Sequence, residues 1–133
     1  MAAKPLIKEF KGAQEGETLL RWAIGNALSV VAGEGDFDAI AELIQDRRYG
    51  TARQMLADAL VGTRDPRSVN ILIGLLKDPD VVGHAIIALG KLRATKARPR
   101  IEPFLDHPMP WIRHEAKRAI EKINRPARRK KRA

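Results

Sequence analysis

An apolar pattern that recurs about every 30 residues constrains the fold more than any other feature of this sequence. In the segment WIRHEAKRAI, apolar residues follow the spacing i, i+4, i+7, i+8, which places four side chains on one stripe of an α-helix. The stripe occurs four times, as Leu20, Ile24, Ala27 and Leu28; Ala52, Leu56, Ala59 and Leu60; Val81, Ala85, Ala88 and Leu89; and Ile112, Ala116, Ala119 and Ile120. Its third position is always alanine, as expected where a neighbouring helix approaches closely.

A second family of apolar stripes lies between the first and has the same period. Its members are Ile40, Leu43 and Ile44; Leu72, Leu75 and Leu76; and Ile101, Phe104 and Leu105, with Ile7 and Phe10 in the same register near the N-terminus. Two independent stripes with one period predict repeated helix-turn-helix units. We therefore expect an all-α fold over residues 1–124, a right-handed α-solenoid of about three full hairpins with a half-repeat at each end.

Capping residues and prolines divide the chain at the same places. Thr18 and Asp36 are expected to cap the helices that follow them, and Asp65 and Asp78 each precede a proline that suits a first helical turn. One conflict remains in RPRIEPFL, where Pro103 falls inside an expected helix. That helix must begin late, with Pro103 in its first turn, or bend there.

The positive charge is concentrated in the C-terminal third of the chain. Residues 1–90 hold 10 Lys/Arg and 12 Asp/Glu, whereas residues 91–133 hold 15 Lys/Arg and 4 Asp/Glu. We expect residues 125–133 to form a disordered basic tail, because they contain no large apolar side chain. The expected acidic-partner surface comprises Lys91, Arg93, Lys96, Arg98, Arg100, Arg113, Lys117, Arg118, Arg128, Arg129, Lys130, Lys131 and Arg132.

The composition excludes several classes of function. The chain has no cysteine, which removes disulfides, thiol nucleophiles and thiolate metal sites. There is no Gly-rich phosphate loop, and neither Ser29 nor Ser68 has a histidine at helical spacing. The N-terminus lacks a secretory signal, and no apolar run approaches the roughly 18 residues of a membrane span. We therefore expect a soluble, cytoplasmic, non-enzymatic protein without a cofactor.

The segment DPDVVGHAIIALGKLRATKARPRIEPFLDHPMPWIRHEAKRAIEKI resembles the short HEAT-like repeats of the phycobilisome-lyase type. The shared features are an acidic residue before proline, a first helix that ends in ALG, and a second helix that closes on LLKD or FLDH. The resemblance covers about residues 4–124. It implies a HEAT-like solenoid, a class that includes scaffolds, adaptors, chromophore lyases, a metal hydroxylase and DNA glycosylases.

The adjacent His114 and Glu115 raise the question of a metal site. Deoxyhypusine hydroxylase, which is similar in its repeats, uses His-Glu pairs from several repeats to hold two irons, and imidazole and carboxylate suit that metal. The equivalent positions here are Gly83 and His84, Gln54 and Met55, and Trp22 and Ala23. Because only His84 could add a ligand, we interpret His114 and Glu115 as part of a polar helix face.

These observations predict a protein interaction scaffold whose basic C-terminal end docks an acidic protein. The alternative is nonspecific binding of nucleic acid through the same cations and the tail. A lyase-like or metal-dependent hydroxylase-like activity is a third, less favoured reading. The half-repeats also suggest end-to-end self-association, and we expect no membrane partner.

Overall fold

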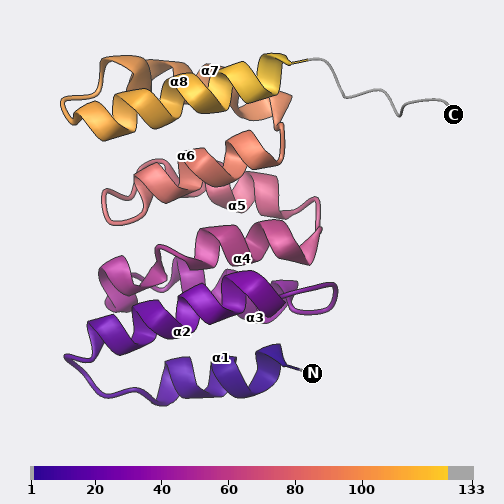
Figure 1. Ribbon diagram of the computed structural model, residues 1–133, viewed down its shortest axis with the longest axis vertical. Coiled ribbons are helices and arrows are strands. Elements are labelled where there is room, and N and C mark those ends of the chain that lie inside the picture. Colours follow the sequence, from indigo (N-terminus) through magenta and orange to yellow (C-terminus); the bar gives the residue numbers. More distant parts are fainter. Residues whose placement is uncertain (1, 126–133) are drawn as a thin grey trace, which may run out of the picture.

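The computed structural model describes residues 2–125, and these residues form helices and turns with no β-strand (Figure 1). The chain is therefore all-α over this range. The elements, with η marking 3₁₀ helices, are α1 (Ala3–Gly12), α2 (Thr18–Val31), α3 (Phe37–Gln45), η1 (Arg47–Arg53), α4 (Leu56–Thr63), α5 (Ser68–Leu75), α6 (Val82–Lys91), η2 (Thr95–Ala97), α7 (Arg98–Ile101), η3 (Glu102–Asp106) and α8 (Pro110–Asn124). The tail predicted to be disordered lies outside the described residues except for Arg125.

The helices follow one another along the long axis of the molecule (Figure 1). Helices α2, α4, α6 and α8 form one row in which each helix contacts the next. Helices α1, α3, α5 and the α7–η3 segment each pack against the row member that follows them in the chain. Helix α1 thus packs on α2, and α8 packs on α7 and η3, so both end helices have a partner within the chain.

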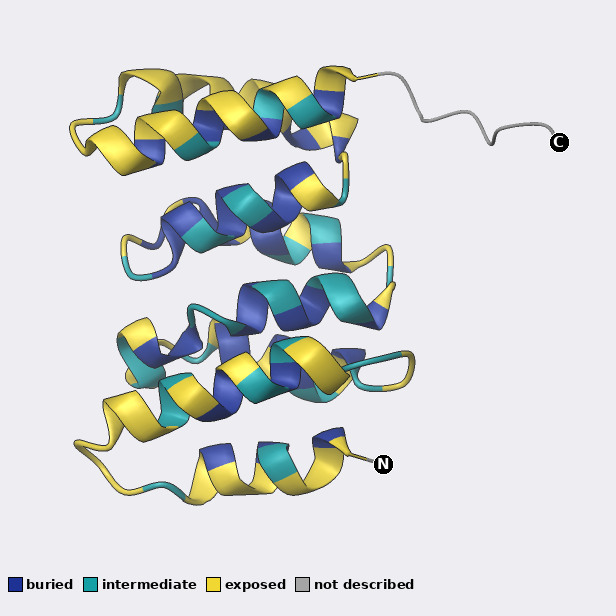
Figure 2. Cartoon of the chain, in the orientation of Figure 1, coloured by how far each residue is buried: buried dark blue, intermediate teal, exposed yellow. Residues whose placement is uncertain are grey.

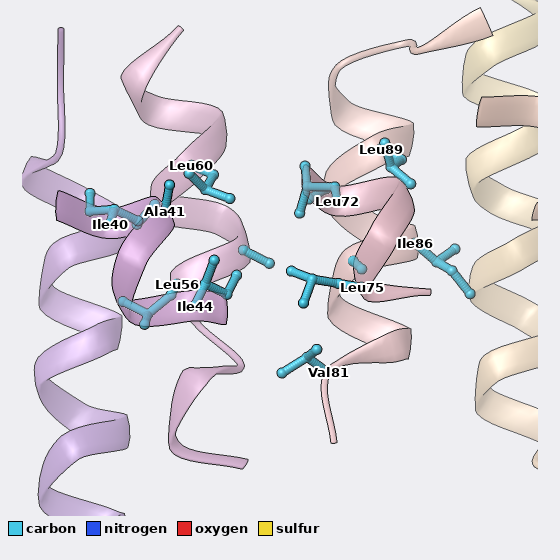
Figure 3. Packing of buried hydrophobic residues seen from close by; sticks show 14 of the residues in the cluster. Ile40, Ala41, Ile44, Leu56, Leu60, Leu72, Leu75, Val81, Ile86 and Leu89 are labelled. Atoms are coloured by element: carbon cyan, nitrogen blue, oxygen red, sulfur yellow. The ribbon is translucent and has the colours of Figure 1, made fainter. Parts of the chain in front are cut away.

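The first family of apolar stripes is buried as predicted, apart from a few positions at its edges. Leu56 and Leu60 of α4 are fully buried, and Figure 3 shows them in one group with Ile40, Ala41 and Ile44 of α3. Leu20 is the main exception, since 46% of its surface is exposed. Burial of the remaining positions forms one continuous hydrophobic core from α1 to α8.

Glycines allow close approach at two of the three contacts within the row. A Cβ atom on Gly62 of α4 would lie 2.9 Å from the carbonyl oxygen of Ala32, which follows α2. A Cβ atom on Gly90 of α6 would lie 2.9 Å from the Cα atom of Ala119 in α8. Helices α4 and α6 share a smaller contact than the α2–α4 and α6–α8 pairs.

The predicted cap at Thr18 is wrong. Helix α2 already includes Thr18, and the Glu17 carboxylate accepts a hydrogen bond from the Gln14 backbone N–H at 2.7 Å. Glu17 thus occupies the N-cap position of α2 and orders the preceding turn, but its side chain makes no capping hydrogen bond to the helix. Asp36 does occupy the N-cap position of α3, but its carboxylate accepts from the Gly33 N–H at 2.9 Å.

The two Asp-Pro pairs close turns just before their helices. Asp65 accepts a hydrogen bond from the Arg67 N–H at 2.9 Å, and Asp78 accepts from the Asp80 N–H at 3.0 Å. The Arg67 guanidinium also donates to Asp65 and lowers the pKa of that carboxyl. Helices α5 and α6 begin only at Ser68 and Val82, with Arg67 and Val81 at their N-cap positions, so the prediction that Asp65 and Asp78 cap these helices is wrong.

Pro103 interrupts the last helix of the second family. In place of one regular helix, the chain forms η2, α7 and η3, and Pro103 lies in the first turn of η3. The break follows from the missing N–H and the steric demand of the proline ring. Of the predicted stripe there, Ile101 is fully buried, while Leu105 is 40% exposed.

Candidate interaction site

The described cations of the predicted acidic-partner surface lie at the C-terminal end of the stack, and their side chains are exposed (Figure 2). Lys91 ends α6, and Arg93 follows it in the turn. Because α7 packs directly on α8, the cations of these two helices share one end of the molecule. The structure places there Lys91, Arg93, Lys96, Arg98, Arg100, Arg113, Lys117 and Arg118. Arg128, Arg129, Lys130, Lys131 and Arg132 lie outside the described residues.

Lys91 is paired with a carboxylate within the chain. Its Nζ atom lies 2.6 Å from Oδ1 of Asp58 on α4. This ion pair joins α6 to α4 and cancels the charge of Lys91 locally. Lys91 therefore contributes less to an anion-binding surface than the sequence suggested.

Lys96 and Arg98 are held by neutral amides, so their charges are not cancelled. The Lys96 ammonium donates to Oδ1 of Asn70 at 2.6 Å, and the Arg98 guanidinium donates to Oδ1 of Asn124 at 2.9 Å. Each hydrogen bond fixes the direction of a long side chain without a counter-charge. Both cations are thus partly oriented before any partner arrives.

Three cations of this end make no hydrogen bond or ion pair with any residue between 2 and 125. They are Arg100 on α7 and Lys117 and Arg118 on α8. Residues 91–125 contain ten Lys/Arg and four Asp/Glu, so the surrounding surface carries excess positive charge. We refer to Lys96, Arg98, Arg100, Lys117 and Arg118 as the basic end.

Arg113 belongs to a different structural set. Its Nη1 atom donates to the backbone carbonyls of His107 at 2.8 Å and Pro108 at 3.1 Å, and so fixes the loop before α8. Arg21, at the equivalent position of the first unit, donates to the Phe10 and Ala13 carbonyls at the end of α1. These arginines satisfy carbonyl groups that a helix end or loop leaves without partners.

Arg53 is the third member of this set, and the sequence analysis missed it. Its side chain is fully buried and donates to the carbonyls of Ile44 and Gly50, each at 2.8 Å. Its Nη2 atom lies 2.9 Å from Oδ2 of Asp78, which is also buried. The repeat pattern could have revealed this set, because an arginine follows the first position of the apolar stripe in three of the four units, at Arg21, Arg53 and Arg113.

His114 and Glu115 do not meet other metal ligands in the described part of the chain. His114 is exposed, whereas His84 packs edge-on against Trp111 with 5.8 Å between ring centroids. Burial lowers the pKa of His84, and the negative charge of Glu115 opposes this shift. Within residues 2–125, no three His, Cys, Asp or Glu side chains are grouped so that they could hold a metal ion.

His107 lies in the turn before α8. Its Nδ1 atom accepts a hydrogen bond from the Met109 N–H at 3.0 Å. The two tryptophans both make contacts within the chain, although 42% of the Trp111 surface remains exposed. None of the described helices is both long and apolar enough to cross a membrane.

Comparison with known proteins finds one short similarity. A segment of 39 residues is 51% identical to part of the phycocyanobilin lyase subunit alpha of Pseudanabaena tenuis. The likeness covers 29% of this chain and 14% of that subunit. No family model and no solved structure matches the chain.

Proposed function

We propose that this chain is a HEAT-like α-solenoid that acts as a non-enzymatic interaction module and docks an acidic protein segment on its basic end. The row of helices with one repeated apolar stripe supports the repeat architecture, and the short likeness to a lyase subunit agrees with it. The observation that carries the function is the presence of Arg100, Lys117 and Arg118 as exposed cations without a partner among the described residues.

The basic end is suited to carboxylates because its cations project from packed helices. Helix α8 buries Ile112, Ala116 and Ala119 against the stack, which fixes the opposite, charged face toward solvent. A rigid array loses little conformational entropy on binding, while electrostatic attraction accelerates the encounter with an acidic partner. Such attraction between exposed charges weakens with salt.

A binding assay with an acidic probe tests this function. The probe is a poly-glutamate peptide, and its affinity is measured for the full chain and for the variant Lys117→Glu/Arg118→Glu. We expect the variant to bind about tenfold or more weakly, because two attractions become repulsions. The matched control, Lys11→Glu/Lys77→Glu, makes the same change in net charge away from the basic end, and it should bind like the parent. Equal losses in both variants would show that only total charge matters.

Nonspecific nucleic-acid binding is the alternative, favoured by the 15 Lys/Arg against 4 Asp/Glu in residues 91–133. It makes a distinct prediction for a duplex DNA probe. If the tail residues from 125 onward make about six phosphate contacts, their removal should change the slope of log affinity against log salt by roughly 5. An unchanged slope, or no binding at low salt, would exclude this alternative.

The enzymatic alternatives predict a bound metal or a modified small molecule. A hydroxylase-like site would retain iron in protein purified without chelators, at one or more atoms per chain. Elemental analysis that finds less than a stoichiometric amount of iron, zinc and manganese would exclude it. A lyase-like role would show as retention of a linear tetrapyrrole during purification.

A further inference from the structure

Helices α6 and α8 lie side by side and run in the same direction (Figure 1). Two glycines of α6 mark the contact, because a Cβ atom on Gly83 would meet the Trp111 ring and one on Gly90 would meet the Cα atom of Ala119. Both contacts follow the same order along the two helices. The N-terminal ends of α6 and α8 are therefore neighbours, and so are their C-terminal ends.

The side of α6 that stays outside the core carries little net charge. Helix α6 buries seven of its ten residues, and those that remain at the surface are His84, Ile87 and Lys91, which follow the spacing i, i+3, i+7 of one helix face. Lys91 is neutralised by Asp58 on α4. Near its N-terminal end this face therefore presents an imidazole and an aliphatic side chain.

Helix α8 continues this surface with an aromatic ring at one end and cations at the other. The spacing i, i+4, i+7, i+11 places on one face of the helix Trp111, Glu115, Arg118 and Lys122. Among residues 2–125, Arg118 and Lys122 have no hydrogen-bond or ion-pair partner. Trp111 and Arg118 are separated by about 10 Å along the helix axis. We refer to these four residues, together with His84 and Ile87, as the α6–α8 platform.

Trp111 offers a partner a rigid aromatic surface. Its ring is held over Gly83 and meets His84 edge-on, with 5.8 Å between ring centroids, yet 42% of the residue is exposed. Met109, two residues earlier in the chain, is 49% exposed. A large aromatic side chain that is already fixed by packing loses little conformational entropy when a partner covers it. The ring is therefore suited to contact with an apolar side chain of the partner.

If the basic end docks an acidic protein segment, as proposed above, the α6–α8 platform specifies that segment further. We propose that the segment carries an apolar anchor, an aromatic or large aliphatic residue, which packs on Trp111 while its carboxylates meet Arg118 and Lys122. The distance of about 10 Å between Trp111 and Arg118 corresponds to about three residues of an extended chain. The anchor therefore lies about three residues from the first carboxylate that binds Arg118.

Glu115 favours a protein segment over a nucleic acid on this platform. It is half-buried and lies between Trp111 and Arg118 on the face of α8. Burial lowers the pKa of His84 and the charge of Glu115 opposes that shift, so the carboxylate is close to the ring. A single strand that stacked a base on Trp111 would carry a phosphate at every nucleotide, and Glu115 would repel the phosphate beside it. A polypeptide can hold uncharged residues at that point.

Tryptophan fluorescence of the full chain tests the apolar anchor. In the variant Trp22→Phe, Trp111 is the sole tryptophan, because the chain has two. The probes are a poly-glutamate peptide and the same peptide with one phenylalanine placed three residues before its glutamates. We expect the phenylalanine peptide to bind about tenfold more tightly, because its ring leaves water. It should also shift the Trp111 emission to shorter wavelength, whereas the poly-glutamate peptide should bind without this shift.

Two further variants separate the anchor from the charges. Trp111→Ala, with its folding checked by circular dichroism, should bind the two peptides with equal affinity. Arg118→Glu/Lys122→Glu should weaken the binding of both peptides by about tenfold or more, because two attractions become repulsions. The gain from phenylalanine should therefore depend on Trp111 and the shared affinity on the cations.

The outcomes distinguish this proposal from the proposed function. If neither peptide binds, both fail. If the two peptides bind the Trp22→Phe chain equally well, or if the phenylalanine peptide leaves the Trp111 emission unchanged, the basic end still docks acidic segments but the anchor is wrong. A single-stranded oligothymidine that displaces the phenylalanine peptide and changes the Trp111 emission would also overturn the anchor, since bases would then occupy the ring.

Discussion

The indole ring of Trp111 in α8 occupies the space that a side chain at Gly83 in α6 would need. A Cβ atom on Gly83 would lie 2.1 Å from Cη2 of Trp111, far closer than two carbon atoms can approach. The ring also makes an edge contact with His84. One absent side chain thus allows the first turn of α8 to close over α6.

The substitution Gly83→Ala should therefore destabilise the fold, by about 1–3 kcal/mol, because the indole must move. Urea denaturation measures the change in the free energy of unfolding. Gly74→Ala is the matched control, since a Cβ atom there meets nothing within 4 Å. That variant should gain up to about 1 kcal/mol from helix propensity. Similar values for the two variants would contradict the packing we describe.

Asp78 is expected to be essential for stability because it lies beside a buried guanidinium. Replacing it by alanine removes the nearest counter-charge of the buried Arg53 and leaves only the more distant Asp80 carboxylate, at 3.6 Å and 46% exposed, and the expected loss is about 3 kcal/mol. Thermal and urea denaturation would show this loss. Asp46→Asn breaks a pair with Arg48 that is open to solvent, and its effect should be small. The prediction fails if both variants are equally stable.

Acidification should destabilise the fold through His84. Its pKa is lowered in the folded state by burial, so the unfolded chain takes up a proton more readily. The stability contributed by neutral His84 is fully present above the ordinary histidine pKa of about 6.5 and is lost as pH falls from there through the lowered pKa of the folded state. The melting temperature of His84→Gln should depend less on pH between about 5 and 7.5 than that of the parent. His114→Gln, which alters an exposed histidine, should keep the parent's dependence.

Trp22 and Gln54 should be energetically coupled. The Trp22 indole N–H donates to Oε1 of Gln54 at 3.2 Å, and the Gln54 amide donates to the Asp80 carbonyl at 3.2 Å. These bonds link α2 to the turn before α6. Trp22→Phe and Gln54→Ala should each cost about 1 kcal/mol, and the double variant should cost less than the sum. Strict additivity in a double-mutant cycle would show that the bond contributes nothing.

The periodicity of apolar residues predicted most of the helices and most of the core, but not the breaks. Ala52, predicted to share one α-helix with Leu56, lies in η1, and Pro103 divides another predicted helix. Leu56, Ala85 and Ala116 occupy one register and are all buried, because a side-chain stripe repeated at helical spacing has few other ways to leave water. The same reasoning failed at Leu20, which lines a groove between α1 and α2 and stays 46% exposed. Sequence periodicity reports which face can be buried and does not report what covers it.

The polar interactions were harder to predict because each depends on which neighbour the charged or polar end of a long side chain reaches in the folded structure. Arginine is usually found at the protein surface, yet the guanidinium of Arg53 is buried and donates to the Ile44 carbonyl inside the core. Lys91 looked like a free cation, and its ammonium lies on Asp58. Nothing in the sequence pattern indicated that position 83 requires a glycine, because the reason is the Trp111 ring that packs against it. In each case the deciding neighbour is distant in sequence, and the one-dimensional pattern does not specify it.

The smaller contact between α4 and α6 has a mechanical consequence. The glycine contacts join α2 to α4 and α6 to α8 into two stiff blocks, and the boundary between them is bridged by the pairs Arg53–Asp78 and Lys91–Asp58. A pulling force along the long axis should therefore separate the blocks at this boundary before either block unravels. The extension would begin where the two ion pairs, the hydrogen bond from Gln54 to Asp80 and the α4–α6 part of the core hold the blocks together.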